Sequence, residues 1–368
     1  MKRIIIFAHF DKQNIIDPYV IDYIRELKKY SEIIFVSDGD LQKKETEKIK
    51  DLCFDIIAKK HGESNDFGSY KRGFQLLQNK YPQKLQEIDE LLFVNDSCYL
   101  IGNFKKIFAD MEKKLDCDFW GLSDDIAQLD YPEYHIQSYF LVFRKEVFLE
   151  SFFQNFISNI KQLRSKNDII YLYEIGITQF LINNNYKHFC YFSRKKIIDF
   201  IKLNKSLLKI CLEKIFYQNT TLAKDVIRKF TKSAFSINCL NYSHSNKFYF
   251  LLEMNFPLIK RNILIKNNIP NEKLVFLWQE ILEKEKKSEA IKKIKNHCNR
   301  IGLKLKNKNH IKNRFNLFLY FLSCLKLFYI KKYLKNGKKV KTIKLLFFKI
   351  KLSDYKRLKL FGIRVWKK

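Results

Sequence analysis

Glycine and proline are both scarce in this chain, with 10 and 5 residues among 368. Their scarcity excludes collagen-like and linker-rich proteins, which depend on these two residues. Eight cysteines are present, but no two of them form a C-x-x-C motif, and their spacing suits neither a zinc site nor a disulfide framework. We therefore expect reduced thiols in a cytoplasmic protein.

Acidic residues are almost missing from the C-terminal part of the chain. Residues 301–368 contain 21 Lys and Arg side chains against one acid, Asp354, so this segment carries +20 of the formal net charge of +31. Such a charge favours anionic partners, namely nucleic acid, anionic lipid or a phosphorylated substrate. Hydrophobic residues make up 46% of the chain, which is enough to bury a sizeable core.

The N-terminal half alternates between short apolar runs and stretches of helical periodicity. The predicted strands are Ile4–Phe7, Glu32–Ser37, Phe54–Ala58, Leu91–Val94, Phe119–Leu122 and Ser138–Phe143. The predicted helices are Asp17–Tyr30, Leu41–Leu52, Tyr70–Asn79, Phe148–Leu163 and Tyr171–Asn183, followed by a mostly helical stretch from Ile198 to His297. This alternation predicts βαβ units and an α/β fold with a largely parallel sheet.

Polar residues gather where the predicted strands end. In parallel sheets, ligands bind beyond the carboxyl ends of the strands. No G-x-G-x-x-G or Walker sequence follows the first strand, which counts against a dinucleotide or P-loop site. The polar residues at these ends are His9, Asp11, Ser37, Asp38, Asp40, Asn95, Asp96 and Ser97.

Several short motifs occur in order over roughly residues 1–270. They are Asp66-Phe67-Gly68-Ser69-Tyr70-Lys71-x-Gly73, Phe93-Val94-Asn95-Asp96-Ser97, Phe119-Trp120-Gly121-Leu122, His135-Ile136-Gln137-Ser138-Tyr139-Phe140, Tyr173-Glu174-x-Gly176-x-Thr178 and Asn255-Phe256-Pro257-Leu258-Ile259-Lys260-Arg261. Together they resemble the rhamnan synthesis F family of bacterial glycosyltransferases. The resemblance implies a GT-A-like nucleotide-binding α/β domain and a sugar-nucleotide donor, commonly dTDP-rhamnose.

The resemblance and the composition together predict three parts. A GT-A-like glycosyltransferase domain is expected over residues 1–200, a mostly helical accessory part over 201–300, and a basic, aromatic tail over 301–368. The ending Leu360–Ile363 also resembles transferases from capsule and lipooligosaccharide gene clusters. The expected reaction is inverting transfer of rhamnose or another deoxyhexose from a nucleoside diphosphate to a surface polysaccharide or a lipid-linked oligosaccharide.

Asn95-Asp96-Ser97 follows the fourth predicted strand, where GT-A enzymes place a donor-binding acid. Asp96 there would hold a divalent cation, Mg²⁺ or Mn²⁺, that bridges to the diphosphate and offsets the charge on the departing nucleotide. Alternatively, Asp96 caps the following turn. Without a metal, the diphosphate charge would fall to basic residues, the candidates being Lys71, Lys260 and Arg261.

The segment Asp66–Lys71 precedes a predicted helix. Asp66 is placed to cap this helix, Gly68 permits close approach of the backbone, and Lys71 can reach a phosphate. Asp38 ends the second strand, where an acid would meet the base or ribose, but a simple turn is an equal alternative. The predicted donor-binding residues are His9, Ser37, Asp38, Asp66, Gly68, Tyr70, Lys71, Asn95, Asp96 and Ser97.

Glu174 is the predicted general base. Its surroundings, Tyr173–Thr178, resemble the acidic helix of inverting family 2 transferases, where a carboxylate removes the proton of the acceptor hydroxyl. The alternative is a carboxylate that only stabilises a helix N-terminus. Asp124 and Asp125, which follow a predicted strand, are the rival bases.

The acceptor or sugar pocket is expected at the motif that begins with His135. The residues predicted to line it are His135, Gln137, Ser138 and Tyr139. Lys260 and Arg261 belong to the last motif of the resemblance and are either substrate contacts or solvated residues.

The tail combines charge with an apolar stretch at Phe315–Ile330, which falls short of the ~20 apolar residues of a spanning helix. It suits an interfacial segment, or else a core helix, and Val340–Leu352 and Leu358–Trp366 are predicted strands. We expect a cytoplasmic enzyme attached peripherally to the inner face of the cell membrane, with no nucleic-acid partner. The alternatives are a basic nucleic-acid-binding protein and a non-catalytic, membrane-attached scaffold.

Overall fold

The computed structural model describes residues 1–126, 133–163, 165–204, 251–265, 282–283 and 286–302, together with the backbone of five strands between residues 328 and 367. The chain forms two compact units, one of residues 1–197, 250–265 and 278–305, and one of residues 198–249, 266–277 and 306–368. Segments from the part predicted as a separate helical domain therefore belong to the first unit. The division at residues 200 and 300 stays a prediction.

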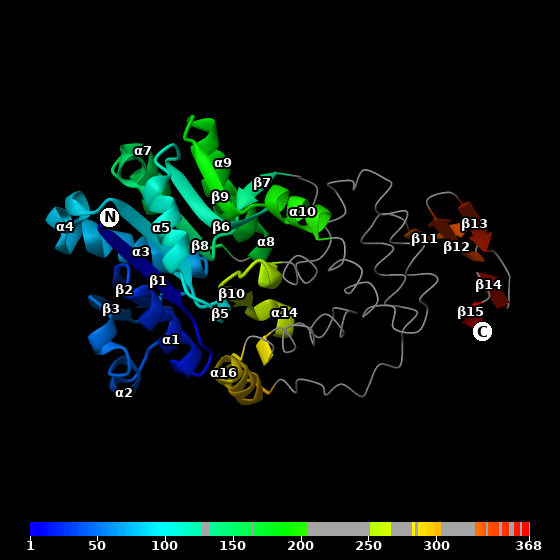
Figure 1. The fold of residues 1–368 in the computed structure, drawn as a ribbon, viewed down its shortest axis with the longest axis horizontal. Helices are drawn as coiled ribbons and strands as arrows, with labels where there is room; N and C mark the ends of the chain where they lie inside the picture. The colour runs from blue at the N-terminus through cyan, green and yellow to red at the C-terminus, as the bar shows by residue number, and fades with distance from the viewer. Residues whose placement is uncertain are drawn as a thin grey trace. The chain divides into compact units, whose positions relative to one another are not determined.

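An eight-stranded sheet forms the centre of the first unit (Figure 1). Its strand order is β3-β2-β1-β4-β8-β6-β7, and β9 pairs with β6. The first four strands along the chain are mutually parallel where they pair, and β8 is antiparallel to both β4 and β6. The strands are β1 (Arg3–His9), β2 (Glu32–Ser37), β3 (Asp55–Ala58), β4 (Glu90–Asn95), β6 (Phe119–Ile126), β7 (Tyr134–Ile136), β8 (Phe140–Arg144) and β9 (His188–Phe192). A separate antiparallel pair joins β5 (Cys98–Leu100) and β10 (Leu258–Lys260).

Helices connect these strands and pack on both faces of the sheet (Figure 1). They are α1 (Pro18–Leu27), α2 (Lys43–Thr46), the 3-10 turn η1 (Lys50–Leu52), α3 (Asp66–Lys80), α4 (Pro82–Glu87), α5 (Lys105–Lys113), α6 (Lys145–Phe148), α7 (Ser151–Ser158), α8 (Lys166–Ile169), the π-helix η2 (Ile170–Ile175), α9 (Gly176–Asn183), α10 (Arg194–Leu203), α14 (Arg261–Ile265) and α16 (Ser288–Arg300). The five cysteines among the described residues are free thiols.

The side chains of β1 alternate between the two faces and so determine the layers. Ile6 lies in one core with Tyr70 of α3, whereas Phe7 contacts Tyr23 of α1, with ring centroids 5.5 Å apart. A Cβ added to Gly73 would lie 2.4 Å from a methyl carbon of Ile6, so a glycine is needed where α3 crosses β1. Helices on both faces of a mostly parallel sheet make an α/β fold, which confirms the predicted class.

Two predicted helices are interrupted in the structure. The stretch predicted as a helix at Leu41–Leu52 contains α2 and η1 as separate short elements, and Tyr171–Asn183 is divided between η2 and α9. Periodicity does not distinguish a continuous helix from consecutive short turns, because both repeat apolar residues about every three to four positions. A π-helical turn is frequent at functional sites, and η2 carries Glu174.

The second unit contains two small antiparallel sheets. One joins β11 (Phe328–Lys335), β12 (Lys338–Leu345) and β13 (Phe348–Leu352), and the other joins β14 (Arg357–Leu360) and β15 (Ile363–Lys367). Strands are present in both ranges predicted from alternation, but Val340–Leu352 is divided between β12 and β13 and Leu358–Trp366 between β14 and β15, and β11 was not predicted. Most of the apolar stretch predicted at Phe315–Ile330 lies outside the described residues. Within the described part of the chain, no helix combines the length and the apolarity that crossing a membrane requires.

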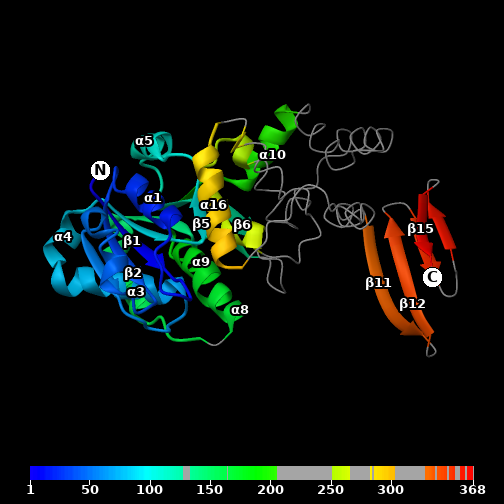
Figure 2. The ribbon, with the colours of Figure 1, turned by 90° about the horizontal axis from the view of Figure 1, so that it is seen from below.

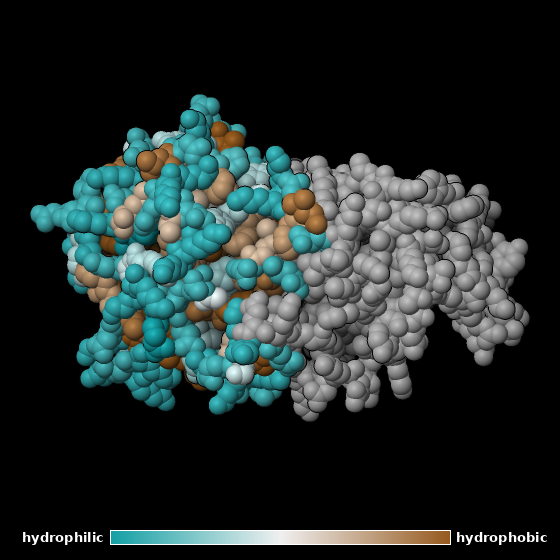
Figure 3. Space-filling model, viewed as in Figure 1, coloured by the Kyte–Doolittle hydropathy of each residue, from teal (hydrophilic) through white to brown (hydrophobic). Residues whose placement is uncertain are grey.

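The last described helix of the first unit, α16, packs against the N-terminal helix α1. Figure 2 shows α16 near α1, and Lys293 of α16 forms an ion pair with Asp22 of α1. The visible face of this unit is mainly hydrophilic, with smaller hydrophobic areas between the polar residues (Figure 3).

The carboxyl ends of β1 and β4 lie beside one another, because β1 pairs in parallel with β2 on one side and with β4 on the other.

Candidate functional site

The strand order reverses between β1 and β4, which is where open α/β sheets bind ligands. β1 ends at His9 and β4 at Asn95. Asp96 is 6% exposed, and its carboxylate faces the end of β1, where Oδ2 accepts a hydrogen bond from the Phe10 amide at 3.3 Å. The structure therefore brings His9 and Asp96 together, with His9 Nε2 lying 3.8 Å from Asp96 Oδ2.

Arg261 is the cation that faces Asp96. Its Nη1 lies 3.2 Å from Asp96 Oδ1 and also donates to the main-chain oxygen of Asp96 at 3.0 Å. The same nitrogen donates to the Tyr19 hydroxyl at 2.7 Å, while the Arg261 amide donates to the Ser97 carbonyl. The guanidinium is thus held at the strand ends, where a diphosphate would meet it.

Asn95 connects the end of β4 to the start of α3. Its Nδ2 donates to Asp66 Oδ2 at 2.6 Å, and its Oδ1 accepts from the Ser97 amide at 3.1 Å and from the Ser97 hydroxyl at 2.5 Å. Asp66 is the first residue of α3, and the N-cap position belongs to Asn65, which makes no side-chain cap hydrogen bond. The predicted cap by Asp66 is therefore wrong, because its carboxylate turns toward Asn95.

Asp66 lies within electrostatic reach of two further carboxylates, those of Asp96 and Glu174. Removal from water, together with the negative charges of Asp96 and Glu174, raises the pKa of Asp66 to about 7. Arg261 and Lys166 oppose the shift without cancelling it. Glu174 accepts a hydrogen bond from the Ser138 amide at 3.3 Å, so it also lies beside the predicted acceptor motif. An excess of negative charge here suits a bound cation or a transferred proton.

Two other predicted donor residues, His9 and Asp38, have different kinds of hydrogen-bond partner. His9 Nδ1 lies 3.0 Å from the Ser37 hydroxyl, and burial lowers the pKa of His9 despite nearby Asp96. Asp38, in contrast, accepts from the main-chain amides of His61 and Gly62, both at 2.8 Å. Asp38 thus holds the loop that follows β3, and its role in donor binding stays a prediction.

Gly68, Tyr70 and Lys71 lie along α3. A Cβ on Gly68 would lie 2.1 Å from the Glu63 carbonyl oxygen, so the glycine allows close approach of a protein loop. The Tyr70 hydroxyl donates to the Ser138 carbonyl at 3.1 Å, and the Lys71 ammonium donates to the Ile160 carbonyl at 2.8 Å. The structure thus brings Tyr70 to the acceptor motif and holds Lys71 on a main-chain oxygen.

Asp124 and Asp125 lie near the end of β6. Asp124 is buried and accepts a hydrogen bond from the Arg194 amide at 2.8 Å, at the start of α10. Asp125 is paired with His135 across the β6–β7 ladder. The charges of Glu174 and Asp96, in contrast, both raise the pKa of Asp66.

The predicted acceptor residues form a connected chain. Gln137 Nε2 donates to His135 Nε2 at 2.9 Å, and Gln137 Oε1 accepts from Lys260 Nζ at 2.8 Å. Lys260 also lies 5.4 Å above the Tyr139 ring, whose hydroxyl is 2.5 Å from that of Ser123. Because Lys260 precedes Arg261, β10 links this chain to the Asp96 site.

A second group of side chains that could hold a metal ion lies nearby. Single ligand atoms of Asp11, Asp17 and His297 lie within 4.8 Å of one another. The Arg300 guanidinium faces both aspartates, with its Nη2 2.6 Å from Asp11 Oδ2. Burial and the charges of Arg261 and Arg300 lower the pKa of His297 to about 4, so the ring is neutral. A divalent cation would have to displace Arg300 from these carboxylates.

Sequence reasoning did not assign roles to Tyr19, Lys166, His297 and Arg300, although all four lie at or beside the site. His297 and Arg300 come from α16, and no spacing in the sequence indicates that this helix reaches the end of β1. Tyr19 follows the proline that begins α1, where it reads as an ordinary core residue. Only the structure shows its hydroxyl between Arg261 and Asp96.

Comparison with known proteins identifies a family. The model described as rhamnan synthesis protein F matches residues 33–295, well over half of the chain. A comparison with curated protein sequences gives no match.

Several solved structures are similar to the chain at low identity. Core-mannan synthase A from Aspergillus fumigatus, in its Mn/GDP form, is 9% identical over 48% of this chain and 69% of that one, with a TM-score of 0.31. Mouse xyloside xylosyltransferase 1 is 10% identical over 52% and 85%, with a TM-score of 0.29. S. aureus TarS in complex with UDP is 11% identical over 95% and 98%, with a TM-score of 0.28. Likenesses of this size support no conclusion about substrates.

Proposed function

Because the chain belongs to the rhamnan synthesis protein F family and is a glycosyltransferase, we propose that it transfers rhamnose or another deoxyhexose from a nucleoside diphosphate, such as dTDP-rhamnose. The acceptor is a growing surface polysaccharide or a lipid-linked oligosaccharide, of the capsule or lipooligosaccharide kind. The observation that carries the proposal is the contact of Asp96 with Arg261 at the ends of β1 and β4, with Asp66 bonded to the neighbouring Asn95.

The donor diphosphate lies against Arg261 and Asp96 in this proposal. Arg261 supplies a fixed positive charge, and Tyr19 holds its guanidinium in place. Asp96 would hold a divalent cation in this proposal, and the cation would take the place of the contact between Asp96 and Arg261. When bound, that cation supplies charge that offsets the departing nucleoside diphosphate.

Glu174 acts as the general base. It removes the proton of the acceptor hydroxyl as the hydroxyl oxygen attacks the anomeric carbon, and the bond from that carbon to the diphosphate oxygen breaks with inversion. The proton ends on the Glu174 carboxylate, and the diphosphate leaves with the electron pair. Asp66 is the second candidate, because a carboxyl group with a pKa of about 7 also accepts a proton near neutral pH.

The basic tail attaches the enzyme to the inner face of the cell membrane, where a lipid-linked acceptor would lie. The charge of +20 over residues 301–368 supports this part of the proposal. The remainder of the chain carries the proposed chemistry.

Product formation tests the function. Full-length protein is incubated with dTDP-rhamnose, Mn²⁺ or Mg²⁺ and a lipid-linked oligosaccharide, and the release of dTDP is measured beside the mass of the acceptor. We expect dTDP release coupled to an acceptor heavier by one deoxyhexose. Absence of both products with every deoxyhexose nucleotide, from protein that is folded, would contradict the proposal.

A further inference from the structure

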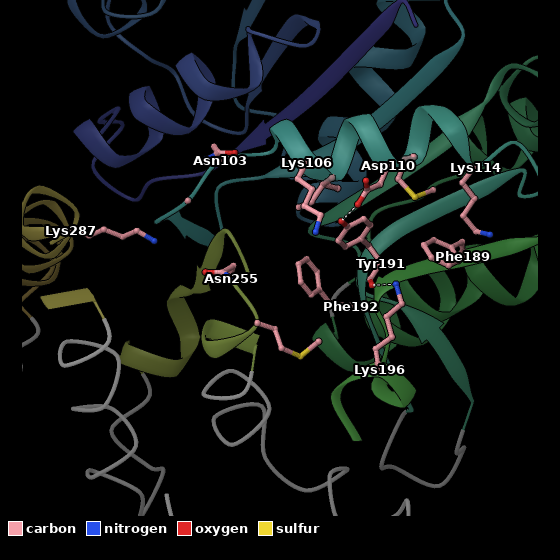
Figure 4. A pocket seen from close by; sticks show the side chains of 14 residues that line it. Asn103, Lys106, Asp110, Lys114, Phe189, Tyr191, Phe192, Lys196, Asn255 and Lys287 are labelled. Carbon is pink, nitrogen blue, oxygen red and sulfur yellow. Dashed lines mark hydrogen bonds between the residues drawn. The ribbon is translucent and has the colours of Figure 1, made fainter. Parts of the chain in front are cut away.

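A basic pocket lies between α5, β9 and the start of α10, outside the group of carboxylates at the ends of β1 and β4 (Figure 4). Its volume is about 650 Å³. Its lining includes four lysines and one acid, together with aromatic side chains from β9. Its charged and aromatic lining residues include Lys106, Asp110, Lys114, Phe189, Tyr191 and Lys196.

Two of these lysines share one aromatic ring. Lys114 Nζ lies 4.6 Å and Lys196 Nζ 4.8 Å from the ring centroid of Phe189. Burial lowers the pKa of Lys196, and the neighbouring charge of Lys114 lowers it further. The two charges therefore repel each other, and an anion bound beside the ring would relieve this cost.

The single acid of the lining offsets this repulsion only in part, because the pKa of Lys196 stays lowered although the charge of Asp110 raises it. Asp110 accepts a hydrogen bond of 2.5 Å from the Tyr191 hydroxyl, as Figure 4 shows. Lys196 donates to the Tyr191 carbonyl, and Lys114 pairs with Asp116, which is exposed and therefore contributes little. The pocket thus keeps an excess of positive charge beside flat apolar rings.

The strand that lines the pocket pairs with the strand that leads to the acceptor motif. Phe192 ends β9 and pairs in register with Ser123 of β6. The Ser123 hydroxyl is bonded to that of Tyr139, whose ring lies under Lys260. The pairing of β6 with β9 thus connects the pocket and the acceptor motif through the sheet.

We propose that this pocket binds the diphosphate and adjoining sugar of the acceptor, a saccharide diphosphate, while its free hydroxyl is presented to the strand-end site. Lys106, Lys114 and Lys196 meet the phosphates, and the aromatic rings of β9 pack against the apolar face of the sugar. This inference rests on the proposed function, since it assumes that the chain acts on a saccharide acceptor.

Calorimetric titration of full-length protein tests the phosphate contacts. Inorganic pyrophosphate is titrated with dTDP present at saturation, so that the donor site is already filled. We expect binding to the wild type and a loss of affinity of at least ~10-fold in Lys114→Gln/Lys196→Gln. The matched control is Lys105→Gln/Lys113→Gln, which removes the same charge from exposed positions of α5 and should bind like the wild type. Equal affinities in the pocket variant and the wild type, or an equal loss in the control, overturn the proposal.

Two further binding measurements identify the ligand. Phe189→Ala should weaken binding of a short saccharide diphosphate but not of pyrophosphate, and equal effects on both overturn the sugar contact. The pocket variant should bind phosphatidylglycerol vesicles without saccharide as the wild type does, and a loss confined to vesicles assigns the pocket to lipid phosphate instead. Should the Lys196 variant not fold, Lys106→Gln/Lys114→Gln gives the same comparison. Titration with dTDP alone reports the donor site, so a failure of the proposed function is seen separately.

Discussion

Arg261 and Asp96 lie 165 residues apart in the chain, yet Arg261 Nη1 contacts both the carboxylate and the main-chain oxygen of Asp96, at 3.2 and 3.0 Å. The contact joins β10 and α14 to the carboxyl end of β4. It also places a guanidinium beside a carboxylate that is almost fully buried. Stability and, under the proposed function, donor binding therefore depend on the same pair.

Arg261→Gln leaves the Asp96 carboxylate buried without its cation. We expect the free energy of unfolding to fall by about 3 kcal/mol, at the low end for a broken buried ion pair because Arg261 is partly exposed. Urea unfolding measures this change. The double variant Asp96→Asn/Arg261→Gln removes both charges and should recover part of the loss. Simple additivity of the two single substitutions would show that the pair does not couple.

Glu174→Gln preserves shape but removes the proton acceptor. Turnover should fall by ~10²–10⁴ while dTDP affinity stays close to that of the wild type. Asp66→Asn and Asp124→Asn are measured beside it by the release of dTDP. A large loss of turnover in either of these variants, with Glu174→Gln unaffected, would assign the base to the other carboxylate.

Asp66 gives the protein a pH-dependent stability. Its pKa rises from 3.8 to about 7 on folding, so between those values the folded state holds a proton that the unfolded state has released. Stability from this group is full below pH ~4 and falls as the pH rises toward ~7. Asp66→Asn cannot ionise, so its melting temperature relative to the wild type should rise from pH 4 to pH 7.5. A difference that stays constant over this range contradicts the shift.

The tail should bind anionic membranes. Each Lys or Arg near such a surface contributes ~1 kcal/mol, so a fraction of the charge over residues 301–368 is sufficient for attachment at low salt. Full-length protein should sediment with phosphatidylglycerol vesicles, be partly released at high salt and ignore neutral vesicles. Binding to nucleic acid at physiological salt, with no affinity for the vesicles, would favour the alternative of a nucleic-acid-binding protein.

The sheet could be predicted because its strands are apolar on both faces. All seven residues of β1 are buried, and such runs between helical stretches are typical of parallel strands. Two short strands that pair only with β6 escaped prediction. β9, His188–Phe192, has partly exposed positions and only five residues, and β7 has three, so neither gives a strong apolar run.

Part of the site could be predicted because it lies where buried strands end. His9 and Asn95 end β1 and β4, Asp96 follows β4, and strand topology alone brings them together. Arg261 was singled out only through a resemblance, and Arg300 was missed, because long-range approach of α14 and α16 has no local signal. Asp38 shows the opposite case, since a strand-end acid can equally hold a protein loop.

The proposed function requires that a nucleoside diphosphate binds at Asp96, and calorimetric titration of dTDP measures this binding. The wild type, Asp96→Asn and the exposed control Asp51→Asn are compared with and without Mn²⁺. The account predicts that the wild type and Asp51→Asn bind dTDP alike and gain affinity with Mn²⁺, whereas Asp96→Asn binds at least ~10-fold more weakly and gains nothing from the metal. Equal affinity of all three proteins for dTDP, with the same response to Mn²⁺, would contradict it.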